Sequence, residues 1–121
     1  MRRSILVAAL LATPLLAGPA LAQTDAATGQ KLYTQKCAIC HAPNQNKIGP
    51  MHKGIVGKKI ASVPGYAYSA AIKKLPGNWT PAALDSWLAN PQKVAPGSKM
   101  VLQVADANQR KAIIAYLATL K

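Results

Sequence analysis

Cys37-Ala38-Ile39-Cys40-His41 is the most informative segment of this 121-residue chain. The pattern C-x-x-C-H is the attachment signature of a c-type haem. In that chemistry the two thiols add across the two vinyl groups on one edge of the porphyrin, and the next residue projects its imidazole under the iron. The segment therefore predicts one covalently attached haem c, with Cys37 and Cys40 as its attachment points and His41 as an axial ligand of the iron.

Two other kinds of site use similar cysteines. A dithiol redox pair of the thioredoxin type normally begins a helix in a strand-rich α/β domain, and this chain shows no sustained alternation of apolar and polar residues. A zinc site needs about four protein ligands, whereas the chain holds two cysteines and two histidines. Both alternatives stay open at this point, and haem attachment is the interpretation that we favour.

The iron of a haem with one histidine ligand either takes a sixth ligand or keeps an open position. The candidates in this chain are Met51, His52 and Met100. Met100 follows a Pro-Gly turn at residues 96–97, which stiffens the approach of the segment, and a thioether paired with histidine raises the reduction potential. We therefore expect His41 and Met100 to be the axial ligands. His52 is expected to be a packed or surface group, or else an alternative ligand.

The first 22 residues predict an export signal. Two arginines form a positive start, residues 5–16 are almost entirely apolar, and residues 20–22 read Ala-Leu-Ala, which is typical of a cleavage site. The apolar run is too short to span a bilayer, and an uncleaved anchor is the alternative. We expect cleavage after Ala22, a periplasmic location without stable membrane insertion, and a single domain over residues 23–121.

Helical periodicity and capping residues predict four helices. We expect them from residue 24 or 25 to the cysteines, over residues 69–74, from residue 80 to an Asn-Pro stop at residues 90–91, and from residue 106 to about residue 120. Residues 42–67 hold three prolines and four glycines and show no strand pattern. The predicted fold class is therefore all-α, with helices packed around one covalently bound haem and long connecting loops, because long loops in a small domain need something to organise them.

The chain is strongly basic, with 15 lysine and arginine residues against three aspartates and a formal net charge of +12. Three scattered acids do not supply the paired carboxylates that glycosidases need. A nucleic-acid partner would fit the charge, but no groove-reading motif accompanies it, so we expect none. We expect a monomer that makes transient contacts with acidic redox proteins, because opposite charges steer such partners together.

Together these features resemble a class I cytochrome c, in the branch of the bacterial cytochromes c2 and the mitochondrial-like proteins, over nearly all of residues 25–121. Gly29 and Tyr33 resemble the small and aromatic positions of the family's first helix, and Tyr116 resembles the last-helix aromatic that packs against them. The Pro50 carbonyl matches the group that accepts a hydrogen bond from the axial histidine in this family.

The resemblance also implies a haem pocket and a docking surface. The implied pocket residues are Pro50, Tyr68, Trp79, Trp87, Asn90 and Ser98. The implied docking surface consists of Lys36, Lys47, Lys93 and Lys99. Six positions depart from the family pattern. Met51 and His52 replace asparagine and leucine, and Lys58 replaces arginine. Ile72 replaces asparagine, Trp87 replaces tyrosine, and Leu102 replaces an aromatic residue.

With both axial positions filled, a substrate cannot reach the iron, so we expect a one-electron carrier and not an enzyme. It would shuttle electrons between respiratory or photosynthetic complexes, or from a periplasmic dehydrogenase to a terminal acceptor. A further possibility is that it is a dedicated subunit of one such dehydrogenase. The alternative is a haem sensor or peroxidase-like protein with an open distal site. A distal histidine or arginine would favour it, but Arg110, the one arginine after residue 22, lies on the last predicted helix.

Overall fold

The computed structural model of the chain describes Pro14 and residues 24–121. The predicted export signal, apart from Pro14, lies outside the described residues, and its cleavage stays a prediction. Among the described residues, no helix combines the length and the apolar character needed to cross a membrane.

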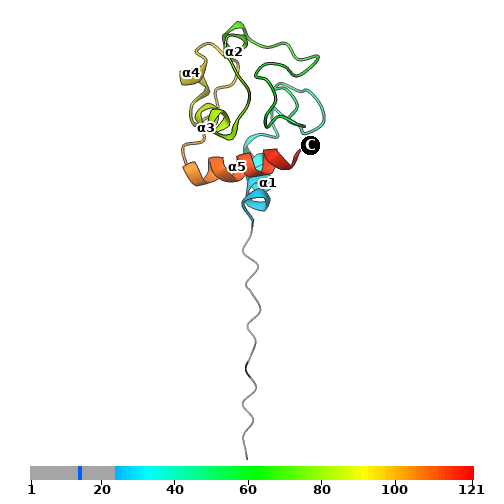
Figure 1. Ribbon diagram of the computed structural model, residues 1–121, viewed down its shortest axis with the longest axis vertical. Coiled ribbons are helices and arrows are strands. Elements are labelled where there is room, and N and C mark those ends of the chain that lie inside the picture. The colour runs from blue at the N-terminus through cyan, green and yellow to red at the C-terminus, as the bar shows by residue number, and fades with distance from the viewer. Residues whose placement is uncertain (1–13, 15–23) are drawn as a thin grey trace, which may run out of the picture.

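The described part of the chain is helical, as predicted (Figure 1). The helices are α1 (Asp25–Lys36), α2 (Ala70–Lys73), α3 (Pro81–Ala89), α4 (Pro91–Val94) and α5 (Ala107–Thr119). Four of them begin where the sequence predicted helices to start, because the side chains of Thr24, Ser69, Thr80 and Asp106 each accept a hydrogen bond from a backbone N–H of the first turn. Within residues 24–121, the β-structure is a single isolated bridge between Lys59 and Asn78.

The short helix α4 is a feature that the sequence did not predict. Asn90 and Pro91 end α3 as expected, but they also start α4, since the Asn90 side chain accepts a hydrogen bond from the Lys93 N–H and Pro91 takes the first helical position. A helix of four residues is too short to show the periodicity from which longer helices are recognised. The consequence is that Gln92 and Lys93 stand on a rigid turn rather than in a loop.

The first and last helices pack against each other at one end of the domain (Figure 1). Gly29 makes the close approach possible, because a Cβ atom at this position would lie 1.9 Å from the carbonyl oxygen of Ala112. The rings of Tyr33 and Tyr116 meet edge to face beside it, with centroids 5.2 Å apart. The predicted contact between these three family positions is therefore present.

Long loops complete the domain opposite α2, α3 and α4 (Figure 1). They are held by specific hydrogen bonds and not by a sheet. The Asn46 side chain donates to the Pro64 carbonyl at 3.0 Å and accepts from the Met51 N–H at 2.9 Å, which joins two loop segments 18 residues apart. Backbone hydrogen bonds from the Trp79 N–H to the Lys58 carbonyl and from the Gly57 N–H to the Trp79 carbonyl anchor the next loop to the start of α3. The helices and these loops together enclose a central pocket.

Candidate functional site: an apolar pocket between His41 and Met100

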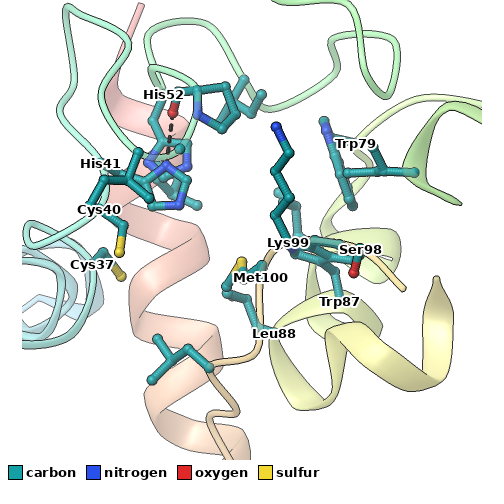
Figure 2. Close-up of a pocket in the computed structure, with 18 of the residues that line it drawn as sticks. Cys37, Cys40, His41, His52, Trp79, Trp87, Leu88, Ser98, Lys99 and Met100 are labelled. Carbon is teal, nitrogen blue, oxygen red and sulfur yellow. Dashed lines mark hydrogen bonds between the residues drawn. The ribbon is translucent and has the colours of Figure 1, made fainter. Parts of the chain in front are cut away.

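A deep pocket lies between the cysteine-containing turn after α1 and the segment that follows α4 (Figure 2). Its walls are mainly apolar side chains from α1, α2, α3, α5 and the loops, among them Ile55, Ile72, Leu84, Leu88, Ile113 and Leu117. The cavity measures about 210 Å³. An apolar cavity of roughly 150 Å³ already accommodates benzene, so this pocket is built for a larger apolar group.

Both cysteines present free thiols to this pocket. Cys37 caps the end of α1, and hydrogen bonds from the N–H groups of Cys40 and His41 to the Cys37 carbonyl keep the chain in a tight turn. This turn places the two sulfur atoms and the imidazole on one side of the pocket (Figure 2). Burial raises the pKa of the Cys37 thiol to about 11, which is partly opposed by Lys36. A dithiol of the thioredoxin type begins a helix in a strand-rich α/β domain, whereas these cysteines follow the end of α1 and the described residues form a helical fold, so the redox-pair alternative does not fit the site.

The orientation of His41 is set by its two loop neighbours. The Nδ1 atom lies 2.8 Å from the Pro50 carbonyl, and since a carbonyl only accepts, Nδ1 carries the proton and Nε2 is left free to bind a metal. A Cβ atom at Gly49 would lie 2.2 Å from Cε1 of the ring, so only glycine lets the loop pack on this imidazole. Burial lowers the pKa of His41, which favours the neutral form that coordinates metals.

Met100 lines the pocket from the side opposite His41 (Figure 2). It follows Pro96 and Gly97, and Gly97 adopts a positive φ of 88° that a glycine accommodates without strain. The predicted ligand pair therefore faces across the cavity from two segments that are distant in sequence.

His52 is placed differently from Met100. Its imidazole stacks on the ring of His41, with centroids 4.1 Å apart, and its Nδ1 atom lies 2.9 Å from the Tyr33 hydroxyl. It therefore lies beside the predicted ligand His41 and not across the pocket from it. Burial and the neighbouring His41 lower the pKa of His52 to about 3. His52 is accordingly a packed neutral side chain, which was one of the roles predicted for it.

Five of the six predicted pocket residues line the cavity, and the sixth does not. Pro50, Tyr68, Trp79, Trp87 and Ser98 face it. The prediction for Asn90 is wrong, because its side chain caps α4 by accepting from the Lys93 N–H and is not among the lining residues. The Tyr68 hydroxyl accepts from the Val63 N–H at 3.1 Å and keeps its own proton for another acceptor.

Two of the four predicted docking lysines, Lys36 and Lys99, line the pocket, and Lys47 and Lys93 are not among its lining residues. The Lys99 ammonium donates to the Ala67 carbonyl at 2.6 Å and lies 5.4 Å from the centre of the Tyr66 ring. The Lys47 ammonium donates to the Ala38 carbonyl at 2.9 Å. Lys36 lines the pocket, and Lys93 is exposed at the end of α4. Two of the pocket-lining residues, Ile48 and Val101, are more than 70% exposed (72% and 73%), so apolar and basic groups share the exposed rim of this pocket.

Two further residues, for which the sequence predicted no such role, hold the chain segment that carries Met100, which we call the methionine segment (residues 96–105). Gln92 hydrogen-bonds to the backbone on both sides of Lys99. Arg110 donates to Asp85 at 2.7 Å and to the carbonyls of Val104 and Ala105 at 3.0 and 2.8 Å. No local motif marks either residue, since their partners lie in other segments.

The donor set of the pocket fits a c-type haem. Two free thiols and a metal-binding imidazole stand on one wall, a thioether stands on the opposite wall, and apolar side chains fill the space around them. The fold and the pocket thus define a small helical protein that holds a haem by two thioether links. The family model for cytochrome c matches residues 26–121, and the chain belongs to this family.

Several relatives agree with this assignment. The chain is 41% identical over 100 residues to cytochrome c2 of Rhodopila globiformis, which covers 80% of the chain and 94% of the relative. It is 39% identical over 104 residues to the cytochrome c-type cyt cy of Rhodobacter capsulatus, which covers 84% of the chain, and it spans only about half (52%) of that protein.

Solved structures lead to the same conclusion. The structure of cytochrome cH from Methylobacterium extorquens is 44% identical with a TM-score of 0.75, and the match covers 79% of this chain and 99% of that one. The ferricytochrome c2 of Rhodopseudomonas palustris is 31% identical with a TM-score of 0.72, covering 81% and 100%. The predicted family and all-α fold are confirmed. The chain carries one covalently attached c-type haem, and it is an electron carrier and not an enzyme.

Proposed function

We propose that this chain is a soluble periplasmic one-electron carrier whose haem iron is held by His41 and Met100. The observation that carries the proposal is their placement on opposite walls of the pocket, with Nε2 of His41 left free by the hydrogen bond from Nδ1 to Pro50. When bound, the haem supplies an iron that changes its oxidation state by one electron. A histidine and a methionine ligand together favour a high reduction potential.

The surrounding residues shield the group and bind its edge. The indole of Trp79 and the hydroxyl of Tyr68 line the pocket and are proposed to donate hydrogen bonds to a propionate. Trp87 and Leu88 line it from α3 and, like Trp79, are almost fully buried, so they exclude water from the iron. With the iron held by His41 and Met100 in a dry pocket, an electron, and not a substrate, would be the species exchanged.

An open distal site, as in a haem sensor or peroxidase, finds no support in the placement of the charged residues. Arg110 is engaged by Asp85 and by two backbone carbonyls, away from the pocket lining. His52 stacks on His41 and does not face it across the pocket. Neither residue is available as the distal acid or base that such chemistry needs.

The partners are proposed to be acidic redox proteins that dock transiently on the rim of the pocket. The pocket lining combines Lys36 and Lys99 with the exposed apolar side chains of Ile48 and Val101. The exposed lysines Lys47 and Lys93 are proposed to extend this basic surface. Opposite charge raises the rate of encounter, and a small interface lets the complex dissociate quickly. The electrons come from respiratory or photosynthetic complexes or from a periplasmic dehydrogenase, and a monomer suffices for this role.

Visible spectroscopy of the haem-loaded protein tests the ligation. We expect a c-type reduced spectrum, a weak far-red sulfur-to-iron band in the oxidised form, and no response of the reduced form to carbon monoxide. Met100→Ala should abolish the far-red band and admit carbon monoxide. The matched control is Met51→Leu, since Met51 is not among the pocket-lining residues. Rapid carbon monoxide binding by the unaltered protein would instead establish an open site.

The location is tested separately. The full-length chain is produced in a bacterial host with a haem-attachment system, and the protein in the periplasmic fraction is weighed by mass spectrometry. We expect a haem-bearing protein that starts at Gln23. A cytoplasmic product with an intact N-terminus would overturn the proposed export without affecting the proposed ligation.

A further inference from the structure

The side chain of Gln92 makes an unusual number of contacts with the segment that carries Met100. Its Nε2 atom donates to the carbonyls of Ser98 and Met100, both at 2.8 Å, and also lies 3.2 Å from the Ser98 hydroxyl. Its Oε1 atom accepts from the Gly97 N–H at 3.1 Å. One amide therefore uses both its donor and its acceptor atoms on three residues, Gly97, Ser98 and Met100, of a single loop.

The position of Gln92 makes these contacts effective. It stands in the first turn of α4, which is fixed by the Asn90 cap and by Pro91. The loop leaves this helix through Ala95, which is almost fully buried (2% exposed), and turns at Gly97. The Gln92 side chain thus links helix α4, where the loop begins, to the backbone of Met100, where the loop ends. Another side-chain tie in this part of the chain is the Lys99 ammonium on the Ala67 carbonyl, which lies at the exposed surface.

We propose that Gln92 is a positioning residue for Met100, which holds the methionine segment closed over the pocket and so controls how readily an outside ligand replaces the thioether. This inference rests on the proposed ligation by Met100. The hydrogen bond to the Met100 carbonyl acts on the ligand residue itself, and those to Gly97 and Ser98 fix the turn that precedes it. Opening the loop requires all of them to break together.

The chemistry of the amide makes the proposal specific. Glutamate has nearly the same shape as glutamine but only accepts hydrogen bonds at neutral pH. In a Gln92→Glu protein the Gly97 N–H keeps its acceptor, whereas the carbonyls of Ser98 and Met100 lose their donor and face a negative charge. Gln92→Ala removes both kinds of contact without adding a charge. The charge-bearing variant should therefore open the loop more than the truncated one.

The test is the binding of imidazole to the oxidised haem-loaded protein, followed by stopped-flow absorbance. At saturating imidazole the observed rate is limited by release of the methionine, so it reports opening of the loop. We expect the limiting rate to rise about tenfold in Gln92→Ala, which corresponds to the loss of one or two net hydrogen bonds, and further in Gln92→Glu. Gln103→Ala is the matched control at an exposed glutamine beyond Met100, and its rate should be unchanged.

A thermal measurement separates positioning from general stability. The far-red band of both Gln92 variants should disappear at a lower temperature than their helical circular dichroism, whereas in the parent and in Gln103→Ala the two signals should be lost closer together. Limiting rates within about twofold of the parent in both variants, or a joint loss of band and helix in all proteins, would overturn the inference. A parent without any far-red band would overturn the proposed ligation and this inference with it.

Discussion

The imidazole of His52 lies against the imidazole of His41, with ring centroids 4.1 Å apart and ring planes inclined by 22°. The Tyr33 hydroxyl lies 2.9 Å from Nδ1 of His52, and the Tyr33 ring meets the His52 ring edge-on. Tyr33 belongs to α1 and also contacts Tyr116 of α5. The proposed axial ligand is therefore connected through His52 to the packed interface between the first and last helices.

The stacked histidine predicts acid sensitivity. Burial and the neighbouring His41 lower the pKa of His52 from 6.5 to about 3. The unfolded chain therefore takes up a proton near pH 6.5 that the folded protein takes up only near pH 3. The stability that follows from a neutral His52 is fully present above about pH 6.5 and is lost as the pH falls toward 3.

His52→Leu measures this contribution. Denaturant unfolding of the parent and the variant is compared at several pH values between about 7 and 4. We expect the free energy of unfolding of the parent to decrease more steeply toward low pH, because leucine cannot bind a proton. If the free energy of unfolding changes with pH in the same way in both proteins, the pKa of His52 is not lowered in the folded state.

Gly29 predicts a steric requirement at the contact between α1 and α5. A Cβ atom there would lie 1.9 Å from the Ala112 carbonyl oxygen and 2.9 Å from Cβ of Tyr116, so the two helices must separate to admit alanine. We expect Gly29→Ala to lower the free energy of unfolding by at least about 2 kcal/mol, although alanine is the better helix former. The control is Gln30→Ala on the exposed side of the same turn, which should be neutral or stabilising. Similar effects of the two changes would contradict the close approach.

Like Gln92, Arg110 contacts the segment that carries Met100, and we expect these contacts to stabilise the fold. Its side chain is 14% exposed and binds Asp85, which is 48% exposed, together with the carbonyls of Val104 and Ala105. We expect Arg110→Met to cost about 2 kcal/mol, mainly because the carboxylate and the carbonyls lose their donors. Lys111→Met is the control, since its 3.8 Å pair with Asp25 is exposed and should contribute about 0.5 kcal/mol or less. Thermal unfolding of both variants decides between a buried and a superficial role for the arginine.

The basic rim predicts charge-dependent electron transfer. Lys93 is exposed on α4 near the methionine segment, whereas Lys111 lies on α5. With the hexacyanoferrate(III) trianion as the oxidant, we expect Lys93→Gln to slow oxidation by about twofold at low salt and to reduce its salt dependence. Lys111→Gln should have a smaller effect. Equal effects of the two changes would mean that only the total charge matters, and not its position at the pocket.

Features that depend on residues close together in the chain could be predicted from the amino-acid sequence. The C-x-x-C-H pattern identifies the attachment chemistry, because both thiols and the imidazole must lie within one turn of chain. The capping residues Thr24, Ser69, Thr80 and Asp106 mark the starts of α1, α2, α3 and α5, since a cap acts on the N–H three residues further along. The Pro-Gly turn at residues 96–97 and the resemblance to the family indicated Met100, and the structure places this residue in the pocket.

Contacts that join distant or irregular segments could be recognised only in the three-dimensional fold. Asn90 caps α4 instead of facing the pocket. The sequence could not predict this role, because a helix of four residues is too short to show a periodic pattern. The stacking of His52 on His41 depends on how the loop after the cysteines folds back. Gln92 and Arg110 are ordinary polar residues in the sequence, and they hold the methionine segment because the fold brings its carbonyls within reach. Periodicity and capping act over a few residues along the chain, whereas these contacts depend on packing in three dimensions.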